Sequence, residues 1–171
     1  RSSDLRSGDT VLIGAAAGAL GTFAVQLARA WGARTVIGTA SEANHDHLRA
    51  LGAVPVTYGE GLVDRIRAVA PDGVDAALDA AGPEGLRAAV AVAKDRDRVV
   101  TMVATEEAAR LGLADWGGTR SAARLAELTA LYEKGAVNVH LRATFPLARA
   151  ADAHRLVATR HGRGKVVLTV G

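Results

Sequence analysis

The sequence contains no cysteine, and aromatic residues make up only 4% of its 171 residues. Without cysteine, the chain cannot form disulfide bonds or thiolate metal sites of its own. It also has no apolar run long enough to span a bilayer, although 49% of its residues are hydrophobic. We therefore expect a soluble, cytoplasmic, single domain whose core consists mainly of Ala, Val and Leu.

A concentration of charge of one sign is also lacking. The 21 Lys and Arg residues are scattered among 18 Asp and Glu residues, which leaves a net charge of +3. No basic block with interleaved aromatic residues is present, and this argues against a nucleic-acid surface. Arg163 and Lys165 near the C-terminus can reach a phosphate, but solvated surface charge is the more typical role.

The sequence shows no catalytic or metal-binding constellation. His45 and His47 are two residues apart and so do not share a helix face, and the other histidines fall in separate predicted elements. Asp75 and Asp79 share a predicted strand, but nothing in the pattern favours a pair of catalytic carboxylates. We expect no catalytic residue and no metal site in this chain.

The stretch from Thr10 to Trp31 has the pattern of a strand, a tight turn and a helix. The apolar run 11–13 is typical of a strand buried on both faces, and apolar residues then recur at helical spacing up to Trp31. Between them, Ala16, Gly18 and Gly21 follow the spacing of the G-x-G-x-x-G dinucleotide fingerprint, with alanine in the first position.

Such a turn favours anion binding. The N-terminus of a helix has unpaired N–H groups and a partial positive charge, and a pyrophosphate reaches them only where no side chain intervenes. We expect Gly18 to leave that approach open and Gly21 to let the helix pack closely on the strand. The predicted pyrophosphate-binding residues are therefore Ala16, Gly18, Ala19, Leu20 and Gly21.

Extended and helical patterns alternate along the chain. Extended segments are predicted at 10–13, 34–39, 54–58, 74–79, 98–103, 111–116, 137–145 and 165–170, and helices at 20–31, 45–51, 62–69, 83–93, 106–110, 121–134 and 147–159. This alternation predicts an α/β fold, a Rossmann-type doubly wound parallel sheet with helices on both faces and the strand order 3-2-1-4-5-6. Ligands of such a sheet bind at the carboxyl ends of its strands.

Six segments in order along the chain carry a family resemblance. They are Gly14–Ala33, Val36–Ser41, Leu51–Ala53, Val74–Gly82, Phe145–Leu147 and Gly162–Val170. Together they resemble the medium-chain dehydrogenase/reductase superfamily, in its zinc-independent, NADPH-dependent quinone oxidoreductase branch. The resemblance implies the cofactor-binding domain of an oxidoreductase that transfers hydride to a quinone or an enone-type small molecule.

The resemblance also implies a second domain. Family members carry an N-terminal GroES-like catalytic domain, whereas residues 1–171 correspond to a single nucleotide-binding domain. We expect residues from about 137 to 171 to pack on that catalytic domain, which this chain does not contain. The alternative is a stand-alone, non-catalytic dinucleotide-binding or sensory module.

The end of the second predicted strand bears on which cofactor binds. An acidic residue there would bind the ribose 2′-OH of NAD, but the position is Ala40. Ser41 and Asn44 can instead donate to the 2′-phosphate of NADPH, although Glu42 and the lack of a basic residue in this loop weigh against tight binding. Alternatively, Ser41 and Asn44 only cap the next helix. A methyltransferase that binds S-adenosylmethionine, with its similar glycine turn, would favour an acid at this position.

Three further residues follow predicted strands at the same edge of the sheet. The family resemblance implies that Tyr58 lies near the adenosine ribose, and that Ala80 and Val103 line the ribose and nicotinamide. Tyr58 can equally be an ordinary tyrosine at the end of a strand.

The predicted strand 111–116 lies at the far edge of the sheet. Its sequence is apolar and carries little charge, and an exposed edge of this kind pairs with another chain unless it is covered. Members of the resembled family dimerise through this edge. We therefore expect a homodimer joined near Leu111–Trp116.

Overall fold

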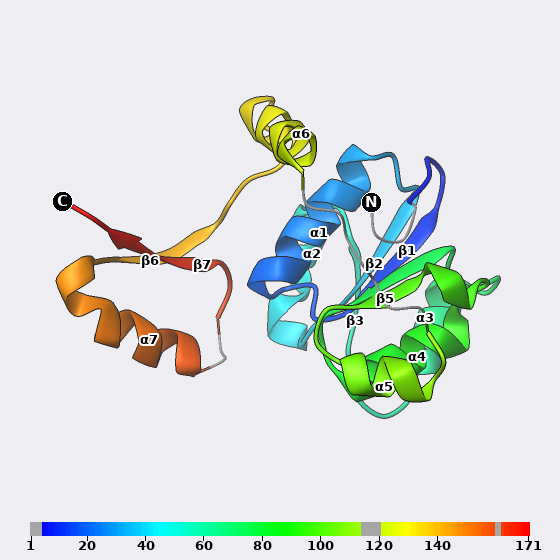
Figure 1. The fold of residues 1–171 in the computed structure, drawn as a ribbon. Coiled ribbons are helices and arrows are strands. Elements are labelled where there is room, and N and C mark those ends of the chain that lie inside the picture. Colours follow the sequence, from blue (N-terminus) through cyan, green and yellow to red (C-terminus); the bar gives the residue numbers. More distant parts are fainter. Residues whose placement is uncertain (1–4, 114–120, 160–161) are drawn as a thin grey trace.

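The computed structural model describes residues 5–113, 121–159 and 162–171 of the chain. Its centre is a five-stranded sheet in the order β3-β2-β1-β4-β5, in which all neighbours are parallel (Figure 1). The strands are β1 (Thr10–Ile13), β2 (Thr35–Thr39), β3 (Val54–Val56), β4 (Ala76–Asp79) and β5 (Val99–Thr101). This order confirms the predicted doubly wound sheet for the first five strands.

Helices cover both faces of the sheet. They are α1 (Ala19–Ala30), η1 (Glu42–Asn44), α2 (His45–Ala50), α3 (Leu62–Val69), α4 (Pro83–Val92), η2 (Arg96–Arg98) and α5 (Thr105–Arg110). Val11 and Ile13 of β1 belong to the core layer under α1 and α2, whereas Leu12 belongs to the layer under α3 and α4. The central strand is therefore buried on both faces, as its continuous apolar run predicts.

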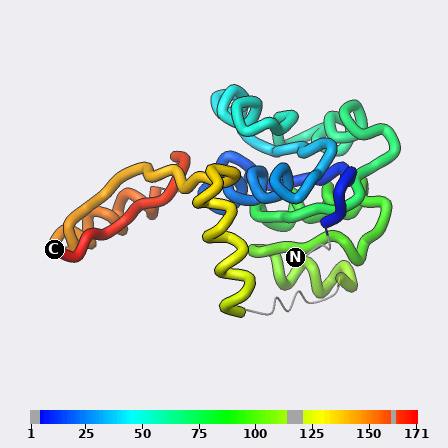
Figure 2. Tube along the Cα trace, turned by 90° about the horizontal axis from the view of Figure 1, so that it is seen from above, coloured from blue at the N-terminus to red at the C-terminus, as the bar shows by residue number. Residues whose placement is uncertain are grey.

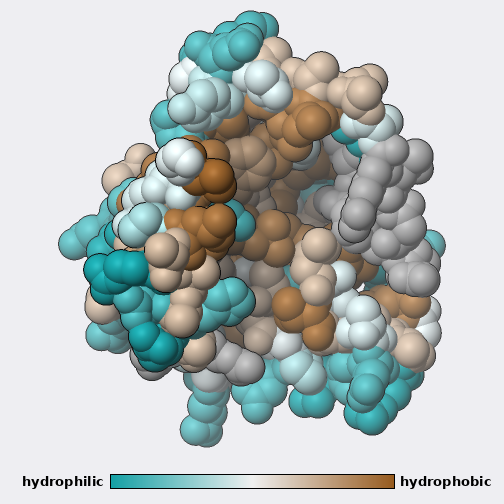
Figure 3. Space-filling model, turned by 60° about the vertical axis from the view of Figure 1, so that its left-hand side comes forward, coloured by the Kyte–Doolittle hydropathy of each residue, from teal (hydrophilic) through white to brown (hydrophobic). Residues whose placement is uncertain are grey.

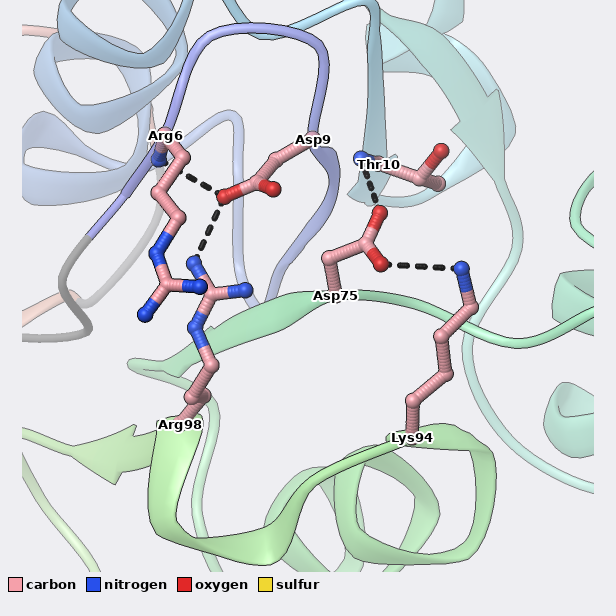
Figure 4. A network of polar contacts seen from close by, with 6 residues as sticks. All are labelled: Arg6, Asp9, Thr10, Asp75, Lys94 and Arg98. Atoms are coloured by element: carbon pink, nitrogen blue, oxygen red, sulfur yellow. Dashed lines mark hydrogen bonds and ion pairs between the residues drawn. The ribbon is translucent and has the colours of Figure 1, made fainter.

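Polar contacts join the amino ends of β1, β4 and β5 (Figure 4). Asp9 pairs with Arg98 at 2.6 Å, and Asp75 accepts from the Thr10 amide at 2.8 Å and pairs with Lys94 at 2.8 Å. Burial alone would raise the pKa of Asp75, but the hydrogen bonds from Lys94 and from the Thr10 amide lower that pKa below its usual range. These charges stabilise the amino end of the sheet, which is the end away from the carboxyl ends of the strands.

The prediction of a strand at 111–116 is wrong for residues 111–113, which the structure describes. The amides of Leu111, Gly112 and Leu113 donate to carbonyl groups of α5 at 2.9, 3.1 and 2.9 Å. Gly112 has φ +65°, so these residues form a helix C-terminus with a left-handed glycine. Leu111 and Leu113 then pack against the core layer under α4. Residues 114–116 lie outside the described residues.

The C-terminal part of the chain forms a smaller unit. After α6 (Ala122–Glu133), β6 (Leu141–Pro146) and β7 (Lys165–Thr169) form a parallel two-stranded sheet, connected through η3 (Leu147–Arg149) and α7 (Ala150–Ala158). We call β6, η3, α7 and β7 the C-terminal unit. It projects from the side of the five-stranded sheet, with α6 beside the junction (Figure 2). Seen from that side, the molecular surface is hollowed and apolar side chains gather in the hollow (Figure 3).

Candidate functional site

The turn between β1 and α1 brings main chain against main chain. A Cβ atom at Gly21 would lie 2.3 Å from the Ala15 carbonyl oxygen and 2.5 Å from the Ala16 Cα. Backbone atoms cannot move aside as a flexible side chain can, so only glycine fits this position. The geometry agrees with the close packing of helix on strand that the sequence predicts for Gly21.

Thr39 at the end of β2 holds this turn in place. Its Oγ1 accepts from the Ala15 amide at 3.0 Å, and its carbonyl oxygen accepts from the Ala16 amide at 2.9 Å. Ala15 has φ +51°, a left-handed conformation that costs a residue with a side chain about 1 kcal/mol. A Cβ at Gly38 would lie 2.8 Å from the Ala16 methyl group. Glycine on the neighbouring strand therefore makes room for alanine in the first fingerprint position.

Helix α1 begins without a side-chain cap. Its N-cap is Gly18, in an extended conformation, and its first turn contains no acidic residue. The first amides of a helix have no partner within the helix, and the helix dipole places partial positive charge on them. This helix end is therefore neither capped nor neutralised by its own side chains, and an anion can bind there.

A cleft of about 1530 Å³ lies along the carboxyl ends of the strands. Residues after β1, β2, β3 and β4 all contribute to its lining. Because β1 pairs with β2 on one side and with β4 on the other, the topological switch point of the sheet is here. The predicted site residues that line this cleft together are Gly18, Ser41, Asn44, Tyr58 and Ala80.

The other predicted site residues have different positions. Ala16 is fully buried beneath the turn, and Gly21 is buried in the contact described above. Ala19 and Leu20 line a smaller pocket of about 230 Å³ between α1 and residues 138–140.

Val103 lines neither the cleft nor the smaller pocket. It is exposed, and its amide donates to the Thr101 hydroxyl at 3.2 Å. The same hydroxyl accepts from the Ala104 amide at 2.9 Å, so the chain turns away from β5 toward α5. This local turn, which the sequence pattern does not show, separates Val103 from the cleft.

The loop after β2 presents a hydroxyl and an amide to the cleft. Asn44 Nδ2 donates to Ser41 Oγ at 2.9 Å, and both side chains are half-buried. Neither side chain caps the helical residues that follow, so the capping interpretation does not describe their contacts. Ala40 at the strand end brings no carboxylate.

Tyr58 lies on a loop that is held by Arg65 of α3. Arg65 Nε donates to the Thr57 carbonyl oxygen at 2.8 Å, and a terminal guanidinium nitrogen donates to the Tyr58 carbonyl oxygen at 3.3 Å. Tyr58 itself is 58% exposed and lines the cleft. Its ring is therefore accessible to a ligand rather than part of the core.

Asp79 organises the loop after β4. Its buried carboxylate accepts from the amides of Ala81 and Gly82 at 3.0 and 3.2 Å and from the Thr101 hydroxyl at 2.7 Å. These donors satisfy a charge that would otherwise be costly to bury. Asp75 precedes β4 and Asp79 ends it, so the two aspartates lie at opposite ends of this strand.

Two arginines that line the cleft have different surroundings. Arg87 Nε donates to the buried carboxylate of Glu107 at 2.6 Å. Arg163, from the turn before β7, makes no hydrogen bond or ion pair with the residues that the structure describes. The sequence allows Arg163 to reach a phosphate, but no local pattern places it in the same cleft as residues 41–44.

His47 of α2 contacts α1 and lies within electrostatic reach of the C-terminal part of the chain. Its Nε2 lies 3.4 Å from the Thr22 hydroxyl of α1. Burial, followed by the positive charge of Arg163 and by His140, lowers the pKa of His47 below its ordinary value. Arg163 is therefore within electrostatic reach of the helix that begins directly after Asn44.

Neither a metal centre nor a membrane segment is found in residues 5–113, 121–159 and 162–171. No group of three His, Asp or Glu side chains in these ranges is placed to hold a metal ion. None of the helices in them is long and apolar enough to cross a membrane.

Comparison with known proteins decides the family. Residues 51–168, more than half of the chain, match the family model described as zinc-binding dehydrogenase. The chain belongs to the zinc-binding dehydrogenase family. This membership confirms the predicted relation to the medium-chain dehydrogenase/reductase superfamily, on the basis of a match that is independent of the glycine turn.

Relatives of this chain differ greatly in length. It is 36% identical to the spectinabilin polyketide synthase system protein NorB of Streptomyces orinoci, over 97% of this chain and 8% of NorB. It is 28% identical to the human synaptic vesicle membrane protein VAT-1 homolog, over 98% of this chain and 52% of that protein. The chain thus spans about half of the VAT-1 homolog and a small part of NorB.

Solved structures of the superfamily share its fold. A quinone oxidoreductase from Coxiella burnetii is 30% identical with a TM-score of 0.77, and the match covers 99% of this chain and 55% of that one. An NAD-dependent alcohol dehydrogenase is 29% identical with a TM-score of 0.82, over 98% and 52% of the two chains. A mycobacterial protein complexed with NADPH is 27% identical with a TM-score of 0.78, over 98% and 59%.

Proposed function

We propose that this chain is the cofactor-binding part of an NADPH-dependent oxidoreductase that transfers hydride to a quinone or an enone-type small molecule. One observation carries the proposal. The uncapped N-terminus of α1 and the loop after β2, with Ser41 and Asn44 but no carboxylate at Ala40, line the same cleft. A pyrophosphate and a 2′-phosphate need these two features at one site.

The residues of the cleft fit a dinucleotide phosphate. The amides at the start of α1 would bind the pyrophosphate behind Gly18, and Ser41 and Asn44 would donate to the 2′-phosphate. Tyr58 would lie beside the adenosine ribose and Ala80 beside the nicotinamide ribose. NADPH supplies the hydride when it is bound, and the protein positions the cofactor.

Names of the similar proteins support this class of reaction. The Coxiella structure is named a quinone oxidoreductase, and the mycobacterial structure holds NADPH. The alcohol dehydrogenase is named NAD-dependent, so the similar structures include both cofactors. Our choice of NADPH therefore rests on the loop after β2 of this chain. With no cysteine in the sequence, we expect this part of the enzyme to bind no catalytic zinc.

Substrate turnover needs a second wall over the cofactor. The nicotinamide would lie at the strand ends near Ala80, and its exposed face needs a surface that holds substrate and excludes water. We expect a GroES-like catalytic domain, packed against residues 137–171, to supply that wall. The isolated chain should therefore bind NADPH without reducing a quinone.

A homodimer remains part of the proposal. Its predicted interface near Leu111–Trp116 would not be a strand edge at 111–113, because Leu111 and Leu113 end a helix and pack against the core. Light scattering on the unaltered chain measures the oligomeric state directly. A monomer at all concentrations would contradict the dimer.

Nicotinamide fluorescence tests the proposed function. We expect the emission of NADPH to change and saturate as the chain is added, and Gly18→Val to weaken this binding at least about tenfold because its side chain obstructs the helix amides. Ala30→Val, at the exposed far end of α1, controls for added bulk on the same helix. No change at millimolar NADPH, or equal binding by Gly18→Val, would contradict the proposal.

A further inference from the structure

The predicted 2′-phosphate site lacks a positive charge in its own loop. Residues 40–44 contain Ser41 and Asn44 as donors and Glu42 as an acid, but no Lys or Arg. A phosphate monoester carries nearly two negative charges at neutral pH. Neutral donors beside a glutamate are a weak site for such a group, so the balancing charge has to come from another segment.

Among the residues that the structure describes, Arg87 and Arg163 are the arginines that line the cleft, and of these two only Arg163 has no partner. The guanidinium of Arg87 is paired with buried Glu107 at 2.6 Å. Arg163 is exposed and has no hydrogen-bond or ion-pair partner among the described residues. A phosphate would therefore meet an unneutralised charge at Arg163 and a neutralised one at Arg87.

The turn that carries Arg163 is fixed against the beginning of β6. Gly162 and Gly164 have φ +104° and +86°, conformations that side chains disfavour. A Cβ at Gly162 would lie 2.5 Å from the Arg142 guanidinium carbon, and a Cβ at Gly164 would lie 2.5 Å from the His140 carbonyl oxygen. The Lys165 amide donates to that same oxygen at 2.8 Å. Arg163 thus projects from a turn whose two glycines pack against the Arg142 side chain and the His140 main chain.

The position of Arg163 relative to the loop after β2 follows from two observations. Arg163 lines the same cleft as Ser41 and Asn44. It also acts electrostatically on His47, which is three residues after Asn44 and so lies on the same side of the helical segment. The free cation is therefore at the ribose end of the cleft that the loop after β2 lines.

We infer that Arg163 recognises the 2′-phosphate of NADPH, so that the C-terminal unit sets the preference for NADPH over NADH. The inference rests on the proposed function and names the residue that decides between the two cofactors. A guanidinium suits this role because its planar fork can donate two parallel hydrogen bonds to one phosphate. NADH lacks the 2′-phosphate and would gain little from Arg163.

Paired titrations of the 171-residue chain test the inference. Dissociation constants for NADPH and NADH are measured for the unaltered chain, Arg163→Ala and Arg163→Lys, together with competition by 2′,5′-ADP and 5′-AMP. We expect Arg163→Ala to weaken the binding of NADPH and of 2′,5′-ADP about tenfold or more, and the binding of NADH less than about threefold. Arg163→Lys keeps the charge but not the planar fork of the guanidinium, so its affinity for NADPH should lie between those of the unaltered chain and Arg163→Ala.

Arg155→Ala is the matched control, because it removes an exposed arginine of the same unit that pairs with Asp152. It should leave both affinities unchanged, and the salt dependence of NADPH binding should decrease in Arg163→Ala only. Equal weakening of NADPH and NADH, or no change in either, would overturn the role of Arg163. Binding of NADH but not NADPH by the unaltered chain would also overturn it. Binding of neither cofactor would instead show that the proposed function itself is wrong.

Discussion

The five-stranded unit and the C-terminal unit are both built from parallel strands and helices, yet they bury their side chains very differently. All four residues of β1 are buried, and Ile37, Leu48 and Ile66 are completely inaccessible. In the C-terminal unit no residue of β6 or β7 is buried, and Leu141 at the start of β6 is 53% exposed. The difference shows that the first unit contains its own core, whereas the second does not.

Under the proposed function, this contrast would let the chain bind a cofactor without forming a complete active site. The buried sheet fixes the turn at Gly18 and the loop after β2, which are the parts of the cleft that need a rigid scaffold. The exposed apolar side chains of the C-terminal unit remain available for a second surface. We propose that this surface is the GroES-like catalytic domain, whose packing would also fix the position of Arg163.

Truncation of a leucine in each unit should give the largest difference. Leu48→Ala removes a fully buried side chain under α2 and should lower the free energy of unfolding by about 2–5 kcal/mol. The same change at exposed Leu141 should alter it by less than about 0.5 kcal/mol. Urea denaturation measures both. Similar losses in the two variants would mean that the C-terminal unit contributes to a common core.

Alanine at Gly21 should destabilise the fold more than alanine at Gly18. At Gly21 the new methyl group meets main-chain atoms at 2.3 Å, and we expect a loss of about 1–3 kcal/mol of stability. At Gly18 the nearest atom would be the Ala15 carbonyl oxygen at 3.2 Å, so the loss should be smaller. Thermal melts test this order. A Gly21→Ala protein as stable as Gly18→Ala would contradict the close approach.

The smallest expected effect is the pH dependence at the junction of the two units. The pKa of His47 is lowered in the folded chain, so the unfolded chain takes up a proton first as the pH falls. Stability from this group is therefore complete above the unfolded pKa of about 6.5 and decreases as the pH falls toward the folded pKa. His47→Gln should show a weaker decrease between pH 7.5 and 5.5 in thermal melts. An unchanged pH profile would show that His47 does not titrate as described.

Local patterns predicted the sheet and much of the cleft because each depends on short stretches of sequence. The apolar run before Gly18 and the alternation of elements were sufficient for the strand order, and strand ends located Ser41, Asn44, Tyr58 and Ala80. Contacts between distant segments could not be predicted in this way. The pairing of Gly38 with Ala16 and the approach of Arg163 both depend on tertiary structure.

The predicted strand at 111–113 is wrong, and Val103 lies away from the cleft, each for a physical reason that the sequence did not show. The apolar residues Leu111 and Leu113 satisfy a strand pattern, but hydrogen bonds to α5 make them a helix end with inward-facing side chains. Val103 follows β5 as expected, yet the Thr101 hydroxyl turns the chain away from the cleft. In both places a local hydrogen bond determined the backbone path.

Amide hydrogen exchange with and without NADPH tests the central claim most directly. We predict that saturating NADPH slows exchange at the start of α1, from Ala19 to Gly21, and in the loop from Ser41 to Asn44. Amides of β6 and β7 should remain the faster-exchanging part of the chain, because no side chain of these strands is buried. Protection absent from the start of α1, or confined to the C-terminal unit, would contradict the account.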